Sequence, residues 1–203
     1  MNFHANDLDS AYEILSNLYS LSTNDGEKIE TSLKTIIANL QSHWKGNDAT
    51  IHINNLMDVC KWLHMIINNV KFVAHNVSMP IVKAQEIRNS NGGRGNVGNI
   101  IPYTEGAPLV FTQLDPTAEY YVDPIGAPAD YNELSDVCDL FTVFCNKFHE
   151  YKEELLNNWI SGSNRDRAAS NFEEFESNVS SYTTKLNNAK GNLEIATTNL
   201  KEM

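Results

Sequence analysis

The sequence is poor in basic residues. It has 15 Lys and Arg against 26 Asp and Glu, which gives a formal net charge of −11 at pH 7. A nucleic-acid-binding protein needs a basic surface for phosphates, and an interfacial helix uses lysine and arginine to reach anionic lipid. The charge balance argues against both, so we expect no nucleic-acid partner. An acidic surface instead suits a partner protein with a basic face.

Long apolar runs and a cysteine framework are also missing. No stretch reaches the ~18 apolar residues of a membrane-spanning helix, so we expect no stable membrane insertion. Residues 1–7 lack the basic segment and apolar run of a secretory signal peptide. Cys60, Cys138 and Cys145 are an odd number without the spacing of a disulfide scaffold. We therefore expect synthesis in the cytoplasm, and we expect any export to use a route that does not read a cleaved signal peptide.

Proline is rare outside one segment. Five of the 6 prolines fall within residues 89–130, beside the glycine-rich residues 91–98. We interpret residues 89–130 as a Gly/Pro-rich linker. Residues 109–112 and 119–122 are rich in β-favouring side chains, with Asp115-Pro116 between them, and this pattern allows a short β-hairpin.

Apolar residues at helical spacing are abundant. They recur every three or four positions over residues 8–40, 53–77 and 134–156, and residues 172–200 keep the alternation of a coiled-coil seam. Asn6 or Asp7 is the expected cap of the first helix. Residues 22–26 are expected to kink or break it, and Pro80 to kink or end the second helix near Ser78.

The helical segments meet at tryptophan–glycine corners. The first is Trp44-Lys45-Gly46 and the second is Trp159-Ile160-Ser161-Gly162. A corner tryptophan can bury its indole between two helices, and glycine can take the left-handed conformation that reverses the chain, with Asn47 or Asp48 capping the next helix. The pattern predicts an all-α fold of two long helical hairpins.

The first corner resembles the motif of the Trp–x–Gly (WXG) family of early secreted antigens, which type VII (ESX) secretion systems export. The second corner matches with one inserted residue. The resemblance implies a tandem, single-chain pseudo-dimer of two such hairpins, residues 1–88 and 131–203, packed as an elongated four-helix bundle. It implies a monomeric or homodimeric state, and secretion without a cleaved signal peptide. It also implies a protein partner, either the secretion machinery or a cognate effector. Tyr182 is followed four residues on by Leu186, where the family's export signal has Asp or Glu.

Patterns for catalysis are weak. Cys60 and His64 lie one helical turn apart, and Cys145 and His149 do the same, but the cysteines fall on or beside apolar stripes, where free cysteine fills a core. The glycine-rich segment lacks the lysine of a phosphate loop. We expect no enzymatic activity, no cofactor and no metal. The alternatives are a helical pore-forming toxin component with residues 109–122 as its β-tongue, and a cytosolic four-helix adaptor or chaperone.

Overall fold

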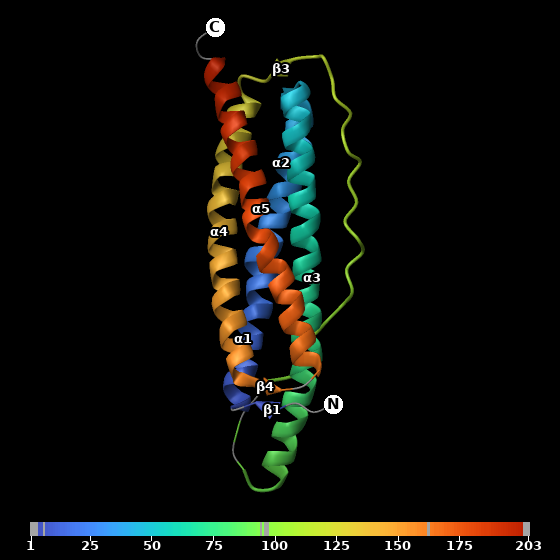
Figure 1. Ribbon diagram of the computed structural model, residues 1–203, viewed down its shortest axis with the longest axis vertical. Coiled ribbons are helices and arrows are strands. Elements are labelled where there is room, and N and C mark those ends of the chain that lie inside the picture. The colour runs from blue at the N-terminus through green and yellow to red at the C-terminus, as the bar shows by residue number, and fades with distance from the viewer. Residues whose placement is uncertain (1–3, 6, 94, 96–97, 162, 201–203) are drawn as a thin grey trace. The chain divides into compact units, whose positions relative to one another are not determined.

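The computed structural model describes residues 4–5, 7–93, 95, 98–161 and 163–200. Most of them are helical, which confirms the all-α class. The helices are α1 (Leu8–Ser20), α2 (Glu27–His43), α3 (Asn47–Ser90), α4 (Gly126–Asn158) and α5 (Ser163–Asn199) (Figure 1). The strands are short: β1 (His4–Ala5), β2 (Trp44–Lys45), β3 (Tyr121–Val122) and β4 (Trp159–Ser161). None of the described helices is long and apolar enough to cross a lipid bilayer.

The first helical stretch starts at a side-chain cap and continues through a wide turn. Asp7 is the cap, because its carboxylate accepts a hydrogen bond of 3.0 Å from the backbone N–H of Asp9. The other candidate, Asn6, lies outside the described residues. Where a kink or break was predicted, the π-helix Leu21–Gly26 joins α1 to α2. There the Thr23 hydroxyl donates to the carbonyl of Tyr19 at 3.0 Å.

Helix α3 runs through Pro80. It does not end near Ser78, which was one of the two outcomes predicted for this proline. Val77 and Ile81 are buried on either side of Pro80 and hold the helix against its neighbours. The Ser78 hydroxyl donates to the His75 carbonyl at 2.9 Å and accepts from the backbone N–H of Ile101 at 3.0 Å. Tertiary packing therefore outweighs the ~3 kcal/mol that an interior proline costs an isolated helix.

Contacts divide the chain into two compact units, and each draws on both halves of the sequence. Unit 1 comprises Met1–Asp25, Ile66–Ala107 and Phe144–Ser177. Unit 2 comprises Gly26–Met65, Pro108–Val143 and Asn178–Met203. The division predicted from the sequence, residues 1–88, 89–130 and 131–203, follows chain order and does not coincide with these units. Each unit contains parts of both predicted hairpins.

Unit 1 has an aromatic core. The ring of Phe148 lies 4.2 Å from that of Phe175 and meets Phe172 edge-on at 5.4 Å, joining α4 to α5. Beside this cluster, the ammonium of buried Lys152 lies 2.7 Å from Glu176 and 2.6 Å from Glu153. Burial alone would lower the pKa of Lys152, but the hydrogen bonds to the two carboxylates outweigh it and raise that pKa.

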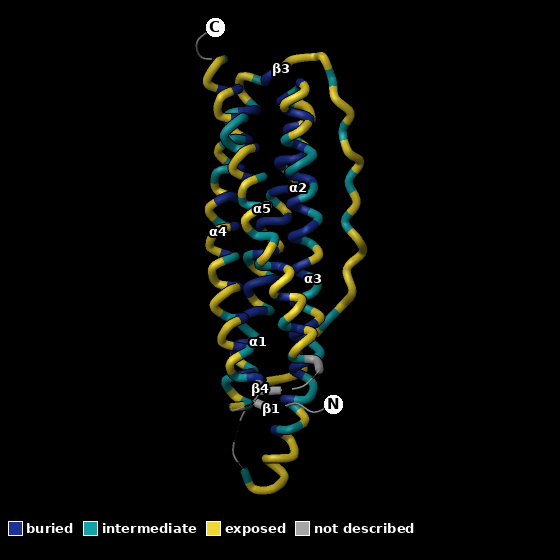
Figure 2. The backbone as a smooth tube through the Cα atoms, in the orientation of Figure 1, coloured by how far each residue is buried: buried dark blue, intermediate teal, exposed yellow. Residues whose placement is uncertain are grey.

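Unit 2 has a mainly aliphatic core that also contains aromatic rings and buried polar side chains. Trp62 of α3 stacks on Tyr182 of α5 at 4.4 Å and contacts Phe141 of α4 at 6.0 Å. Buried Glu30 of α2 pairs with Lys34 and with Nδ1 of His64 on α3, the latter at 3.1 Å. Most residues of the predicted stripes are buried, and buried positions recur along the helices (Figure 2).

The short β-hairpin that the sequence allowed within residues 89–130 does not form between residues 109–112 and 119–122. Residues 109–112, all in the described part of the chain, form no strand, and β3 pairs with β2 instead. The Asn54 side chain holds Leu114 extended against α3, because its amide donates to the Leu114 carbonyl at 3.0 Å and accepts from the Leu114 N–H at 2.9 Å. Pro108 and Pro116 on either side lack the N–H groups that a strand ladder needs.

Candidate functional site at the tryptophan corners

The first corner turns through a short extended segment. Helix α2 ends at His43, and Trp44 adopts an extended backbone with φ −141° and ψ 112° while its N–H bonds to the Leu40 carbonyl. Strand β2 then pairs antiparallel with β3, with Trp44 opposite Val122 and Lys45 opposite Tyr121. An ion pair of 3.2 Å between Lys45 and Glu119 extends this contact. Residues 119–122, from the segment between the two predicted hairpins, therefore pack against this corner.

Gly46 provides the reversal that the sequence predicted. Its φ is +136°, a value that residues with a side chain rarely adopt. Space is not the constraint, because a Cβ here would lie 3.4 Å from the Tyr120 ring and 3.8 Å from the Glu119 carbonyl. The Gly46 carbonyl accepts from the N–H of Thr50 at 3.0 Å and so starts α3. Asn47 and Asp48, the predicted caps, are instead the first residues of that helix.

A histidine–aspartate contact fixes the start of α4 beside the corner. Nδ1 of His43 lies 2.7 Å from the buried carboxylate of Asp130, which also accepts from the Asn39 amide at 3.1 Å. The His43 carbonyl accepts from the backbone N–H of Asp123 at 2.7 Å. A Cβ on Gly126 would lie only 2.6 Å from the His43 ring, so the close approach of the two residues requires glycine here. Sequence reasoning missed this contact because 87 residues separate His43 from Asp130.

Asp123 links β3 to α4. Its carboxylate accepts from the backbone N–H groups of Ile125 at 2.9 Å and Gly126 at 3.2 Å. These bonds lower the pKa of Asp123, with a smaller contribution from His43. Asp123 thus follows a two-residue strand and precedes a helix, as Asp7 does after β1.

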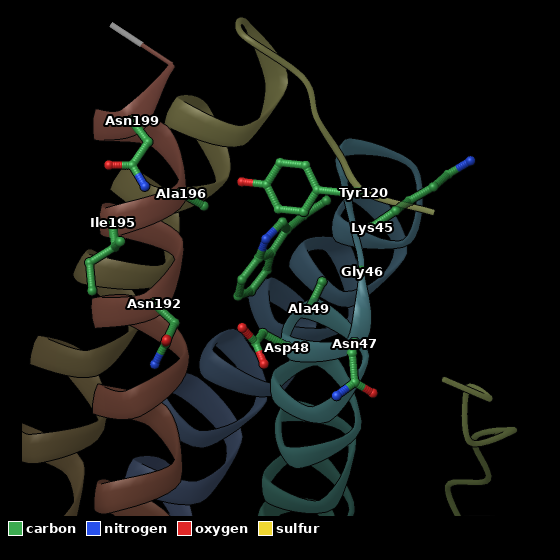
Figure 3. A pocket seen from close by; sticks show the side chains of 11 residues that line it. Lys45, Gly46, Asn47, Asp48, Ala49, Tyr120, Asn192, Ile195, Ala196 and Asn199 are labelled. Atoms are coloured by element: carbon green, nitrogen blue, oxygen red, sulfur yellow. The ribbon is translucent and has the colours of Figure 1, made fainter. Parts of the chain in front are cut away.

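A pocket of about 230 Å³ lies beside Trp44. The start of α3 lines one side, while Asn192, Ile195 and Asn199 of α5 line the other, and Tyr120 extends toward α5 (Figure 3). Tyr120 and Ile195 are 71% and 60% exposed, so this end of unit 2 presents apolar surface. Trp44 is only 4% exposed. The predicted burial of the corner indole is confirmed.

His52 supports the indole of Trp44. The two rings are stacked, 5.9 Å apart and 6° from parallel. Burial lowers the pKa of His52, and the nearby carboxylate of Asp48 opposes this shift only in part. His52 is therefore held neutral at physiological pH.

The second corner has the same plan with a different partner strand. Trp159 is 2% exposed, and β4 pairs antiparallel with β1, with Ala5 opposite Trp159 and His4 opposite Ser161. The Arg165 guanidinium caps the end of α4 by donating to the carbonyls of Trp159 and Leu156, the latter at 3.1 Å. The predicted turn residue Gly162 lies outside the described residues.

The strand pairing is reciprocal along the chain. Strand β1 precedes α1 and pairs at the Trp159 corner, whereas β3 precedes α4 and pairs at the Trp44 corner. Each of these strands is followed by a capping aspartate, Asp7 or Asp123. Sequence analysis did not find β1, because two residues cannot show the alternation that identifies a strand.

The cysteines are not placed for nucleophilic chemistry. Burial raises the pKa of Cys60 to about 12, of Cys138 to about 11 and of Cys145 to about 12, so all three are protonated at neutral pH. His64 faces Glu30 at 3.1 Å, and the Cys60 thiol contacts the Glu30 carbonyl at 3.8 Å. Within the described ranges, no group of three His, Cys, Asp or Glu side chains has metal-binding geometry.

These features define a class: a helical protein with two buried tryptophan corners, each closed by a short strand from the other half of the sequence. Comparison with family models, with curated proteins and with solved structures finds no match to this chain.

Proposed function

We propose that this chain is a non-enzymatic helical protein that serves as a substrate or effector partner of a type VII secretion system and acts through helix–helix contacts. The repeated corner carries the proposal. Trp44-Lys45-Gly46 combines a buried indole, an extended tryptophan and a glycine with positive φ. Trp159 repeats the burial and the strand pairing. This geometry supports the resemblance to the WXG family drawn from the sequence.

We further propose that the helices pack as a four-helix bundle, so that the chain is a single-chain pseudo-dimer. In unit 2, Trp62 of α3 contacts both α4 and α5 through Phe141 and Tyr182, and His64 of α3 contacts Glu30 of α2. In unit 1, Phe148 of α4 contacts α5. Contacts of this kind support a shared core between the two predicted hairpins.

Export is tested in a bacterium that carries a type VII system. An epitope-tagged chain should accumulate in the culture medium, and deletion of the secretion ATPase should retain it in the cells. Trp44→Phe keeps an aromatic ring and should reduce export, whereas Trp62→Phe removes an indole away from the corners and should not. Equal recovery from medium with and without the ATPase would contradict the proposed role.

Co-expression with the products of neighbouring genes distinguishes a substrate from an effector partner. Tyr182 is followed by Leu186 rather than by an acidic residue at the position of the family's export signal. If the chain is an effector partner, export should rise when a cognate effector is co-expressed, and the two should co-purify. If it is a substrate in its own right, co-expression should leave export unchanged.

The pseudo-dimer is tested by cutting the connecting segment. A protease site inserted after Glu105, which is exposed, divides the chain into residues 1–105 and 106–203. After cleavage the two pieces should elute together on gel filtration with their helical circular dichroism intact. Separate elution of the two pieces would show that the hairpins do not share a core.

A further inference from the structure

A second pocket lies in unit 1 beside the other corner tryptophan. It has a volume of about 260 Å³. Its apolar walls come from Phe72, Val73 and Val77 of α3 and from Trp159. Phe72 is held in place by Tyr103, whose ring meets it edge-on at 5.4 Å, yet 47% of Phe72 stays exposed. An engineered apolar cavity of ~150 Å³ is enough to bind benzene. The pocket therefore has room for a phenyl-sized group with a polar substituent.

The charge in this pocket is positive. Among the described residues that line it, Arg167 alone is charged, and the remaining polar side chains are asparagine amides. Arg167 is exposed and forms no ion pair with any described residue, whereas Arg165 is committed to backbone carbonyls. Arg167 also lies near the N-terminal end of α5, where the helix dipole adds positive potential.

The pocket beside Trp44 has a different charge. Asp48 lines it, and its one lysine, Lys45, is neutralised by Glu119 at 3.2 Å. The two tryptophan corners thus share a backbone plan but not a surface chemistry. An anion would be repelled at the first corner and attracted at the second.

We propose that the Trp159 pocket binds a carboxylate carried on a small aromatic or apolar group. The guanidinium of Arg167 pairs with the carboxylate, for which its planar fork of donors is well shaped. The apolar body packs against Phe72, Val73 and Trp159. This proposal does not rest on the secretion role, and its test needs only the purified chain.

Binding is tested by nuclear magnetic resonance with phenylacetate as the probe and sodium chloride matching its ionic strength. The chain has 3 tryptophans, so the indole N–H signals of Trp44, Trp62 and Trp159 report on separate places. The Trp159 signal should move and saturate, while the Trp44 and Trp62 signals stay fixed. Neutral phenylacetamide should bind about tenfold more weakly, because it lacks the charge.

Variants of the pocket complete the test. Arg167→Gln should abolish the preference for the acid over the amide, while Lys83→Gln, which removes an exposed charge of α3 outside the pocket, should preserve it. Asn171→Phe places a ring at the pocket and should block both probes. Unchanged positions of the other indole signals will show that each variant is folded.

A second acid distinguishes the two possible sources of the carboxylate, a peptide terminus and a free small acid. This acid is N-acetylphenylalanine, which imitates the C-terminal residue of a peptide. Tighter binding of this acid would assign the site to a peptide terminus, and tighter binding of phenylacetate to a free small acid. Equal affinity for acid and amide, equal movement of all the indole signals, or an unaltered preference in Arg167→Gln would overturn the proposal.

Discussion

Replacing Gly46 by alanine tests the corner directly. The added methyl group meets no serious obstacle, because the nearest atoms would be 3.4 Å and 3.8 Å away. The cost comes from the backbone, since φ is +136° and a Cβ disfavours that conformation by about 1–3 kcal/mol. Gly46→Ala should therefore lower the free energy of unfolding by roughly this amount.

Gly191→Ala is the matched control. Gly191 lies inside α5, and beyond its own helix backbone nothing lies within 4 Å of its would-be Cβ. It is not among the glycines with positive φ. Alanine there should stabilise the protein by about 0.5–1 kcal/mol, because glycine loses more backbone entropy in a helix. The same chemical change should thus have opposite signs at the two sites.

The assay is urea unfolding followed by circular dichroism. With a denaturant slope of about 3 kcal/mol/M, the midpoint should fall by roughly 0.3–1 M for Gly46→Ala and rise by roughly 0.2–0.3 M for Gly191→Ala, at unchanged slope. A neutral or stabilising Gly46→Ala would refute the positive-φ corner. A destabilising Gly191→Ala would contradict a regular α-helical backbone at this position of α5.

Three further predictions follow from the first corner. Trp44→Ala should destabilise by about 3–5 kcal/mol because the indole is buried, and Trp44→Phe by clearly less; an unchanged melting curve for Trp44→Ala would exclude the buried corner. Cysteines at Lys45 and Tyr121, which face each other across β2 and β3, should form a disulfide under mild oxidation, and failure to crosslink would contradict the register. As pH falls below about 6.5, the unfolded chain should protonate His52 more readily than the folded chain does, so stability present above that pH should decline; His52→Phe should remove this part of the decline, and an unaltered pH profile would contradict it.

The local features of the fold were readable from the sequence. Apolar spacing gave the buried helix faces, because one face of a helix must leave water wherever such a stripe repeats. Asp7 and Gly46 were identified because capping and left-handed turns depend on the chemistry of single residues. Trp44 followed from its place between two stripes.

Features that depend on distant partners were not readable. Pro80 continues a helix because Val77, Ile81 and Ile101 hold the backbone there, and no local pattern records that support. Strand β3 lies in the β-favouring residues 119–122, but it pairs with β2, whereas the sequence suggested residues 109–112 as a possible partner. The pockets could not be predicted, since each collects side chains from three or more separate segments or helix ends.

The stability of the first corner must come mainly from side chains. Two residues of antiparallel pairing are marginal in water, even with their backbone hydrogen bonds made. The Lys45–Glu119 pair is solvent-exposed on both sides and adds at most ~1 kcal/mol. The His43–Asp130 contact is different, because the Asp130 carboxylate is buried and would lose a charge-assisted hydrogen bond, worth ~1.5–3 kcal/mol, if the corner opened. Because His43 also binds the backbone of Asp123 at 2.7 Å, opening the corner would release β3 and the start of α4 together. The end of α2 and the start of α4 therefore behave as one element, although nearly half of the sequence separates them.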